Sequence, residues 1–265
     1  MSDNVGVLPS SSPAAITVAT DELGGIHYPI YKDFYIDVAA GNVAGHSIVN
    51  KFGQNDDLNT TTYEDIWDGG ATYTYPADAT APITHVDSSD AADTGLVEVQ
   101  GLDVNGDLVV QSATLTGTTP VLLTTALWRV FRLKNTGTAN YVGTVQAVNT
   151  ADNVVYARIL IGNNQTLMAL YTVPNNKTGY LFQFNANMSL VTRSVSASGR
   201  RAHRPFGGVF QLKDTFGVGS DGGSQGIELP LYERIAGKTD IKISAISSAN
   251  GAAMNARFSL LLVDD

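Results

Sequence analysis

The stretch LVEVQGLDVNGDLVVQSATL, residues 96–115, decides the fold class. Apolar and polar residues alternate on both sides of its centre, which is the period of a strand with one buried face. The centre holds Asn105 and Gly106, and Asn-Gly is favoured in two-residue type I′ hairpin turns because both turn positions need a positive φ. The stretch therefore predicts an antiparallel hairpin that turns on Asn105 and Gly106.

Short strand-like runs continue this pattern along most of the chain. Upstream lies IHYPIYKDFYIDVA, and downstream lie NYVGTVQAVNT, VVYARILIG, LMALYTVP, TGYLFQFNANMS, GGVFQLKDTF, GIELPLYERI, DIKISAIS and ARFSLLLVDD, separated by Gly, Asn or Pro. Many short strands with regular turn signals indicate an all-β protein, and we expect a jelly-roll-like antiparallel β-sandwich with an extended N-terminal arm. Only PVLLTTALWRVFRLK fits either a helix or a buried strand.

The N-terminal residues lack this pattern. Residues 1–25 are rich in Ser, Ala, Pro and Gly, and LPSSSPAA places two prolines around three serines, which favours extended chain without a core of its own. We therefore expect residues 1–40 to form an attachment arm. Residues 41–265 are expected to form the sandwich body, with two sub-sandwiches that meet near residue 120 as one option.

Composition narrows the class of protein. Charged residues make up 15% of the chain, against about 25% in an average domain. The absence of cysteine excludes disulfides, thiolate zinc sites and cysteine nucleophiles. Neither a secretory signal nor an apolar stretch of about 18 residues is visible, so we expect a soluble protein made in a cytoplasm, with no membrane partner.

Charge is unevenly distributed along the chain. The net charge is −9, but residues 1–120 carry 17 Asp and Glu against two Lys, whereas residues 121–265 carry a net charge of +6. The overall negative charge argues against a nucleic-acid partner. Opposite charge in the two halves suits attraction between subunits or contact with two different partners.

One basic cluster stands out in the second half. SGRRAHRPF, residues 198–206, contains Arg200, Arg201, His203 and Arg204. Guanidinium groups bind carboxylates in a bidentate manner, and the acidic first half supplies carboxylates. We expect these four residues to contact a partner subunit, with a solvated loop and a phosphate or polysaccharide site as alternatives.

No catalytic or metal site is predicted. DVNGD, residues 103–107, opens like a calcium loop, but Leu108 and Thr114 occupy the positions that need Gly and Glu. The four histidines lack the spacing of a helical metal pair, and GVGSDGG does not match the nucleophile elbow. Four carboxylates could supply a glycosidase-like pair, although sequence gives no distance between them: Asp57, Glu64, Asp65 and Asp68. We expect a non-enzymatic protein without cofactor or metal.

The block KFGQNDDLNTTTYEDIWDGGATYTYPADA, residues 51–79, resembles a block in structural proteins of tailed bacteriophages, particularly marine phages. The matching positions are Lys51, Phe52, Gly53 and Asn55, then Ile66, Trp67, Asp68, Gly69 and Gly70, then Tyr73, Tyr75 and Pro76. VEVQGLDVNGD, LWRVFRLKNTGTANYVGTV and FSLLLVDD follow in the order that such proteins use. The resemblance therefore covers nearly the whole chain.

This resemblance implies a bacteriophage virion structural protein. The leading expectation is a capsid decoration or cement protein, or a head-fibre subunit, which docks on the major capsid protein or neighbouring virion proteins. It would sit on the capsid surface as a homo-oligomer, with a trimer favoured. The alternatives are a tail-associated adaptor or receptor- or carbohydrate-binding module that uses Trp67, Tyr73 and Tyr75, and a polysaccharide hydrolase that uses the carboxylates of residues 56–68.

Within the block, Trp67-Asp68-Gly69-Gly70 predicts a tight corner. Glycine takes a positive φ without a steric penalty, so Gly69 and Gly70 suit such a turn. Asp68 can hydrogen-bond the turn backbone, and Trp67 has the area to pin the corner to the sandwich.

Overall fold

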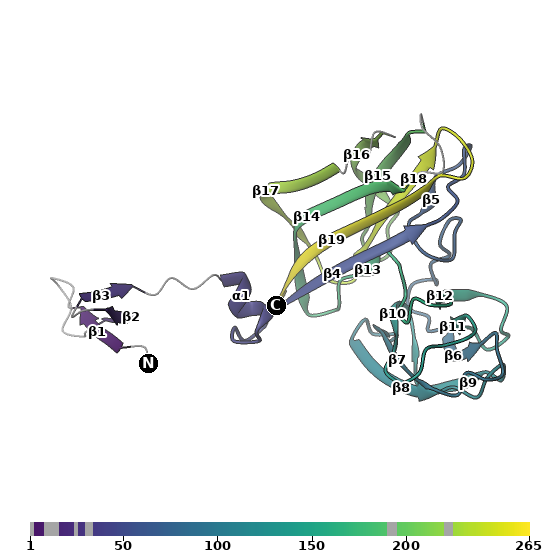
Figure 1. Ribbon diagram of the computed structural model, residues 1–265, viewed down its shortest axis with the longest axis horizontal. Helices are drawn as coiled ribbons and strands as arrows, with labels where there is room; N and C mark the ends of the chain where they lie inside the picture. The colour runs from purple at the N-terminus through teal and green to yellow at the C-terminus, as the bar shows by residue number, and fades with distance from the viewer. Residues whose placement is uncertain (1–2, 8–15, 24–25, 30–33, 190–194, 220–224) are drawn as a thin grey trace. The chain divides into compact units, whose positions relative to one another are not determined.

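The computed structural model describes residues 3–7, 16–23, 26–29, 34–189, 195–219 and 225–265, and the ribbon is drawn in Figure 1. The chain divides into two compact units, residues 1–47 and residues 48–265. The first unit contains a three-stranded antiparallel sheet of β1 (Asp3–Val7), β2 (Ile16–Leu23) and β3 (Ile26–Pro29), followed by the short helix α1 (Phe34–Ala39). The LPSSSPAA segment, residues 8–15, lies outside the described residues.

The second unit contains a jelly roll made of two facing antiparallel sheets. One sheet runs in the order β17 (Gln225–Ile235), β14 (Lys177–Ser189), β19 (Ala253–Asp264), β4 (His46–Asn55). The other runs in the order β13 (Leu170–Thr172), β18 (Asp240–Ser247), β15 (Ala197–Arg204), β16 (Gln211–Val218), with β5 (Glu64–Asp65) also paired to β18. The strands of these two sheets can be numbered 1 to 8 in chain order, from β4 as strand 1 to β19 as strand 8, with β5 and β13 counted together as strand 2. The two sheets then have the strand orders 6-3-8-1 and 2-7-4-5. This is the strand order of a jelly roll, so the predicted fold class is confirmed.

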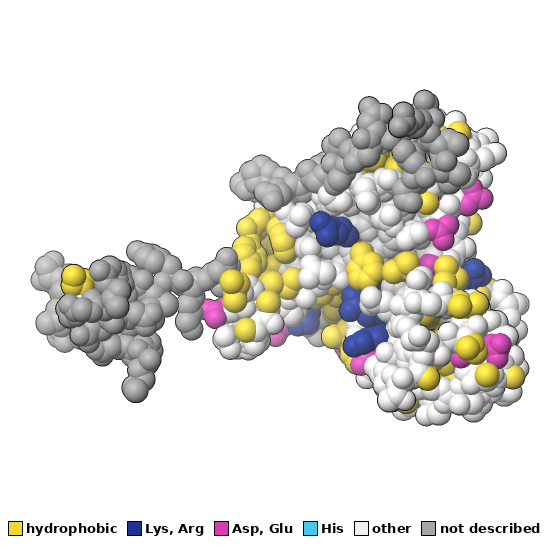
Figure 2. All heavy atoms as spheres, in the orientation of Figure 1, with side chains coloured by type: hydrophobic (Ala, Val, Ile, Leu, Met, Phe, Trp, Pro, Cys, Tyr) yellow, Lys and Arg dark blue, Asp and Glu magenta, His cyan; other side chains and the backbone are white. Residues whose placement is uncertain are grey.

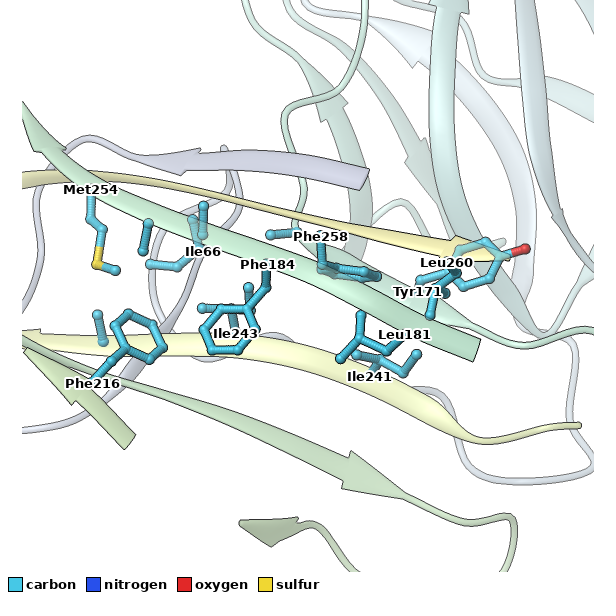
Figure 3. Close-up of a cluster of buried hydrophobic side chains, with 14 of the residues drawn as sticks. Ile66, Tyr171, Leu181, Phe184, Phe216, Ile241, Ile243, Met254, Phe258 and Leu260 are labelled. Carbon is cyan, nitrogen blue, oxygen red and sulfur yellow. The ribbon is translucent and has the colours of Figure 1, made fainter. Parts of the chain in front are cut away.

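Strand alternation explains the core between these sheets. On β14, Phe184, Ala186 and Met188 point inward and are at most 9% exposed, whereas the intervening positions point outward. Figure 3 shows Phe184 and Phe258 of the first sheet facing Ile243 and Phe216 of the second sheet. Burial of such side chains is the main stabilising term of the sandwich.

A second lobe is inserted into one strand of the jelly roll. Asp65 pairs with Ser244, and the Ile66 amide donates to the Ile243 carbonyl at 2.9 Å. The next residue along β18, Lys242, pairs with Leu170. Ile66 and Leu170 thus occupy successive positions of one interrupted strand, and residues 67–169, hereafter the inserted lobe, leave the sheet and return without a shift of register.

The inserted lobe contains two antiparallel sheets and a hydrophobic core of its own. One sheet has the order β10 (Arg129–Asn135), β7 (Leu96–Leu102), β8 (Leu108–Thr114), and the other has the order β12 (Val155–Ile159), β11 (Val145–Val148), β6 (Ile83–Ser88), β9 (Val121–Leu127). Both sides of residue 120 belong to this lobe, so the two cores do not divide there. The ambiguous run PVLLTTALWRVFRLK forms the strands β9 and β10 rather than a helix.

The predicted hairpin is present, but its turn differs from the prediction. Leu102 pairs with Leu108, and only Gly106 of the two central residues has a positive φ, +87°, so the turn is not type I′. The Asp103 carboxylate accepts hydrogen bonds from the backbone amides of Asn105 and Asp107 at 2.8 and 2.9 Å. These bonds start the turn at Asp103, and the loop is longer than two residues.

Candidate functional site

The two lobes are joined by a short antiparallel stem, residues 66–68 and 167–169. The Ala169 amide donates to the Ile66 carbonyl at 2.8 Å, and the Asp68 amide donates to the Leu167 carbonyl at 2.9 Å. The Asp68 Oδ2 atom accepts the Leu167 amide at 2.9 Å. Asp68 therefore binds the returning chain and not the turn that follows it, which corrects the expectation from sequence.

Trp67 anchors the stem in the core of the inserted lobe, not in the sandwich as expected. Its side chain is 6% exposed and packs edge-on against Tyr73 with 5.1 Å between ring centroids. A Cβ atom at Gly69 would lie 2.1 Å from the Trp67 ring, so this position needs glycine for space. Of the two glycines, only Gly70 has a positive φ, +62°. The sequence identified the corner but assigned one glycine the wrong role.

Asp68 lies in an unusual electrostatic environment. Its Oδ1 atom is buried and has no hydrogen-bond partner among the described residues. Burial raises the pKa of Asp68 to about 7. The hydrogen bond from Leu167 and the positive charges of Arg158 and Lys51 lower this pKa, but burial has the larger effect. Burial likewise lowers the pKa of Lys51 well below its usual value. The stem therefore contains a carboxyl group that titrates near neutral pH.

The other carboxylates of the acidic block also serve the chain itself. Asp65 is fully buried and accepts hydrogen bonds from Ser244 Oγ at 2.6 Å and the Tyr73 amide at 2.9 Å, and its Oδ1 lies 2.9 Å from Lys242 Nζ. Glu64 accepts the Asn59 amide at 3.1 Å, and Asp57 accepts the Gly251 amide at 3.1 Å. These contacts give no specific support for a catalytic pair among the four carboxylates.

A buried ion-pair network crosses between the lobes. Asp240 of β18 is fully buried and accepts from Arg129 Nε at 2.9 Å and Arg204 Nε at 2.8 Å. Asp78 accepts from Nη2 of the same two arginines at 3.2 and 3.1 Å, which closes a ring of four charges. Thr172 Oγ1 also donates to Asp240, at 2.5 Å. The network joins the jelly roll to the inserted lobe.

Sequence reasoning missed three members of this network. Arg129 is the single charged residue of the apolar run LWRVF, and this was the available signal, because a lone charge in a buried strand requires a partner. Asp240 gave a weaker signal, because Lys242 lies two residues away in TDIKI. Asp78 gave no comparable signal. Its partners are 51 and 126 residues away in the chain.

The predicted basic cluster lies on strand β15 rather than in a loop. Arg201 and His203 are 3% exposed, and Arg201 pairs with Asp214 and Glu233. The Arg201 Nη1 atom lies 2.7 Å from His203 Nε2, and burial together with the charges of Arg201 and Lys213 lowers the His203 pKa to about 3.

The other two residues of the basic cluster, Arg200 and Arg204, lie on the opposite face of β15 from Arg201 and His203. Arg204 belongs to the network of Asp240, and Arg200 stacks on Tyr63 at 3.8 Å. The four basic residues therefore do not share one surface, and their contact with another subunit stays a prediction.

The described residues show no group of three or more His, Cys, Asp or Glu side chains that could hold a metal ion. No helix in the described part of the chain has the length and apolarity needed to cross a membrane. Asn105 and Gly106 lie at the hairpin tip, where the Gly106 carbonyl accepts the Asn175 amide at 2.7 Å.

Comparison with known proteins gives only distant likenesses. No protein-family model matches the chain, and no curated protein matches it. Among solved structures, the chain is similar to that of the infectious bursal disease virus Gt strain, with 12% identity, coverage of 82% of this chain and 72% of that chain, and a TM-score of 0.22.

Two further structures of the same virus show a comparable likeness. The VP2 subviral particle has 12% identity, coverage of 83% and 72%, and a TM-score of 0.22, and the virus-derived T=1 particles have 11% identity, coverage of 83% and 70%, and a TM-score of 0.22. The likeness to tailed-phage proteins therefore depends on the sequence resemblance alone.

Proposed function

We propose that this chain is a non-enzymatic structural protein of a virus particle. The observation that carries the proposal is the jelly roll with a second lobe inserted in register into one of its strands. Jelly rolls are a common architecture of viral capsid proteins and of lectins, so the fold is compatible with a role in a virus particle. The resemblance of residues 51–79 to phage structural proteins points the same way.

The contacts of residues 51–79 support a structural role, because the polar and aromatic side chains of this block bind other parts of the same chain. The block that carries the resemblance supplies Trp67 to a core, Asp68 to the stem and Asp65 to a buried hydrogen-bond cluster. The residues of this block serve to hold two lobes together. This favours an assembly protein over a hydrolase.

The finer proposal is a capsid-surface decoration or cement protein, or a head-fibre subunit, that docks on the major capsid protein as a homo-oligomer, with a trimer favoured. Three exposed apolar side chains on β8 and β9, Leu108, Val110 and Leu122, are 51–68% exposed and would supply contact area for a neighbouring subunit. A tail-associated adaptor or receptor-binding module is the second candidate. Trp67 and Tyr73 are buried and cannot contact a receptor.

The experiment is a particle-incorporation assay with the full chain and with a variant that lacks residues 1–47, the first unit. We expect the full chain to co-purify with particles and to appear on the head surface in particle images. The shortened chain should fold but fail to incorporate. Absence of the full chain from particles would refute the virion role, and normal incorporation of the shortened chain would refute the attachment role of residues 1–47.

A further inference from the structure

A polar groove crosses the outer face of the sheet that contains β4, β19 and β14. It has a volume of about 340 Å³, within the range of small-ligand sites, and Leu167 of the stem also lines it. Its polar and aromatic lining comes from three strands: Phe52, Gln54, Asn185, Asn187, Asn255 and Arg257.

Strand register explains why these side chains gather. Asn185 pairs with Arg257, and Asn187 pairs with Asn255, so their side chains project from the same face of neighbouring strands. The alternate residues of β14 point into the core. Figure 2 shows a mostly uncharged surface over β14 and β19, with a basic patch among white atoms. The sheet itself therefore fixes the spacing of the groove's polar groups.

The hydrogen-bonding chemistry of the groove matches sugar hydroxyls. Each carboxamide offers two donors and an acceptor, and a hydroxyl group both donates and accepts. The side chains of Asn187 and Asn255 make no hydrogen bond to any other described residue, so their capacity is available to a ligand. Phe52, 36% exposed, adds an apolar ring face beside these amides.

Arg257 gives the groove its charge preference. It is exposed and forms no ion pair within the described part of the chain, and no described residue that lines the groove is acidic. Arg257 is the one charged residue among the described residues that line the groove, and Asp56 beside the groove accepts a hydrogen bond from Gln54 Nε2. A guanidinium group binds a carboxylate through two parallel hydrogen bonds.

We propose that this groove binds an acidic saccharide, with the sugar carboxylate on Arg257, the hydroxyl groups on the amides of Asn187 and Asn255, and the sugar ring against Phe52. This binding activity goes beyond the structural role and does not depend on it. It assigns a ligand class to a surface that lies apart from the stem aromatics which the sequence had suggested for carbohydrate contact.

The test is calorimetric titration of the full chain with short oligogalacturonates and with the same oligosaccharides after reduction of their carboxyl groups. We expect the acidic form to bind and the reduced form to bind at least about tenfold more weakly, as expected for loss of one charge-assisted pair. Arg257→Ala should remove this preference, and Asn187→Ala should weaken binding of the acidic form.

Matched controls keep the result interpretable. Lys213→Ala removes another exposed cation, on β16, and should leave binding unchanged. Thermal melting should show that all variants remain folded. The proposal is wrong if the native chain binds no oligogalacturonate, if it binds the reduced form equally well, or if Arg257→Ala binds like the native chain. None of these outcomes bears on particle incorporation.

Discussion

At the scale of single residues, the molecule uses buried charge to specify which segments meet. Asp240 accepts hydrogen bonds from arginines of both lobes, and Asp68 accepts a hydrogen bond from the Leu167 amide in the second segment of the stem. A buried carboxylate is costly without partners, so each of these positions favours the one arrangement that supplies them. This specificity comes from groups far apart in the sequence.

We expect replacement of Asp68 by Asn to flatten the dependence of stability on pH. The folded-state pKa of Asp68, about 7, lies above the unfolded value of 3.8, so the folded state holds its proton more tightly. The free energy of unfolding should therefore fall as pH rises from about 4 through about 7, by about 3 kcal/mol between pH 5 and pH 8.

Urea unfolding at a series of pH values measures this effect. Asp68→Asn should lose that part of the slope, whereas Asp56→Asn, at an exposed position, should keep it. Identical slopes in the native chain and in Asp68→Asn would contradict the assignment.

We expect Asp240→Asn to destabilise the second unit by about 3–5 kcal/mol, because Arg129 and Arg204 would lose a shared, fully buried counter-charge. The matched control is Asp264→Asn, which removes a carboxylate with 57% side-chain exposure that pairs with Lys177 and should cost at most about 1 kcal/mol. Equal losses for the two variants, measured by chemical denaturation, would argue against the network.

At the scale of elements, the decisive feature is an interrupted strand. Local patterns predicted most strands because alternation and turn residues are local signals. The insertion could not be predicted in this way, since it depends on the pairing of Ile66 and Leu170 with neighbouring residues of β18. The hairpin turn type was missed for a different, local reason: the Asp103 carboxylate accepts the Asn105 and Asp107 amides and so starts the turn two residues before Asn105.

We expect residues 66–170 to fold in isolation. Every buried residue of the second core lies between Trp67 and Leu170, and the length falls within the usual range of about 50–200 residues for a domain. Trp128 and Phe131 pack in the jelly-roll core of the full chain and would become exposed in the fragment. We therefore expect the fragment to melt at a lower temperature than the full chain.

The measurement is cooperative thermal unfolding of this fragment, followed by near-ultraviolet circular dichroism. A fragment with Val99→Asp in its core should not fold, which provides the control. A native fragment without a cooperative transition would show that the inserted lobe needs the jelly roll.

At the scale of the whole molecule, the opposite charges of the two halves meet inside the chain. Lys242 pairs with Asp65, and Asp78 pairs with both Arg129 and Arg204, so basic residues of the second half neutralise acidic residues of the first. The sequence had suggested attraction between subunits or two different partners. Part of that complementarity is instead intramolecular, and composition alone could not distinguish the two cases.

The geometry of the stem has a consequence for how such a chain can change over time. Its two segments lie side by side, and the strand resumes at Leu170 without a change of register. A foreign domain with adjacent termini could join the same two points without a change in the pairing along β18, provided that it also supplies a cation for Asp240 and apolar side chains in place of Trp128 and Phe131. An exchange of the inserted lobe would therefore have to conserve this small interface as well as the two connection points.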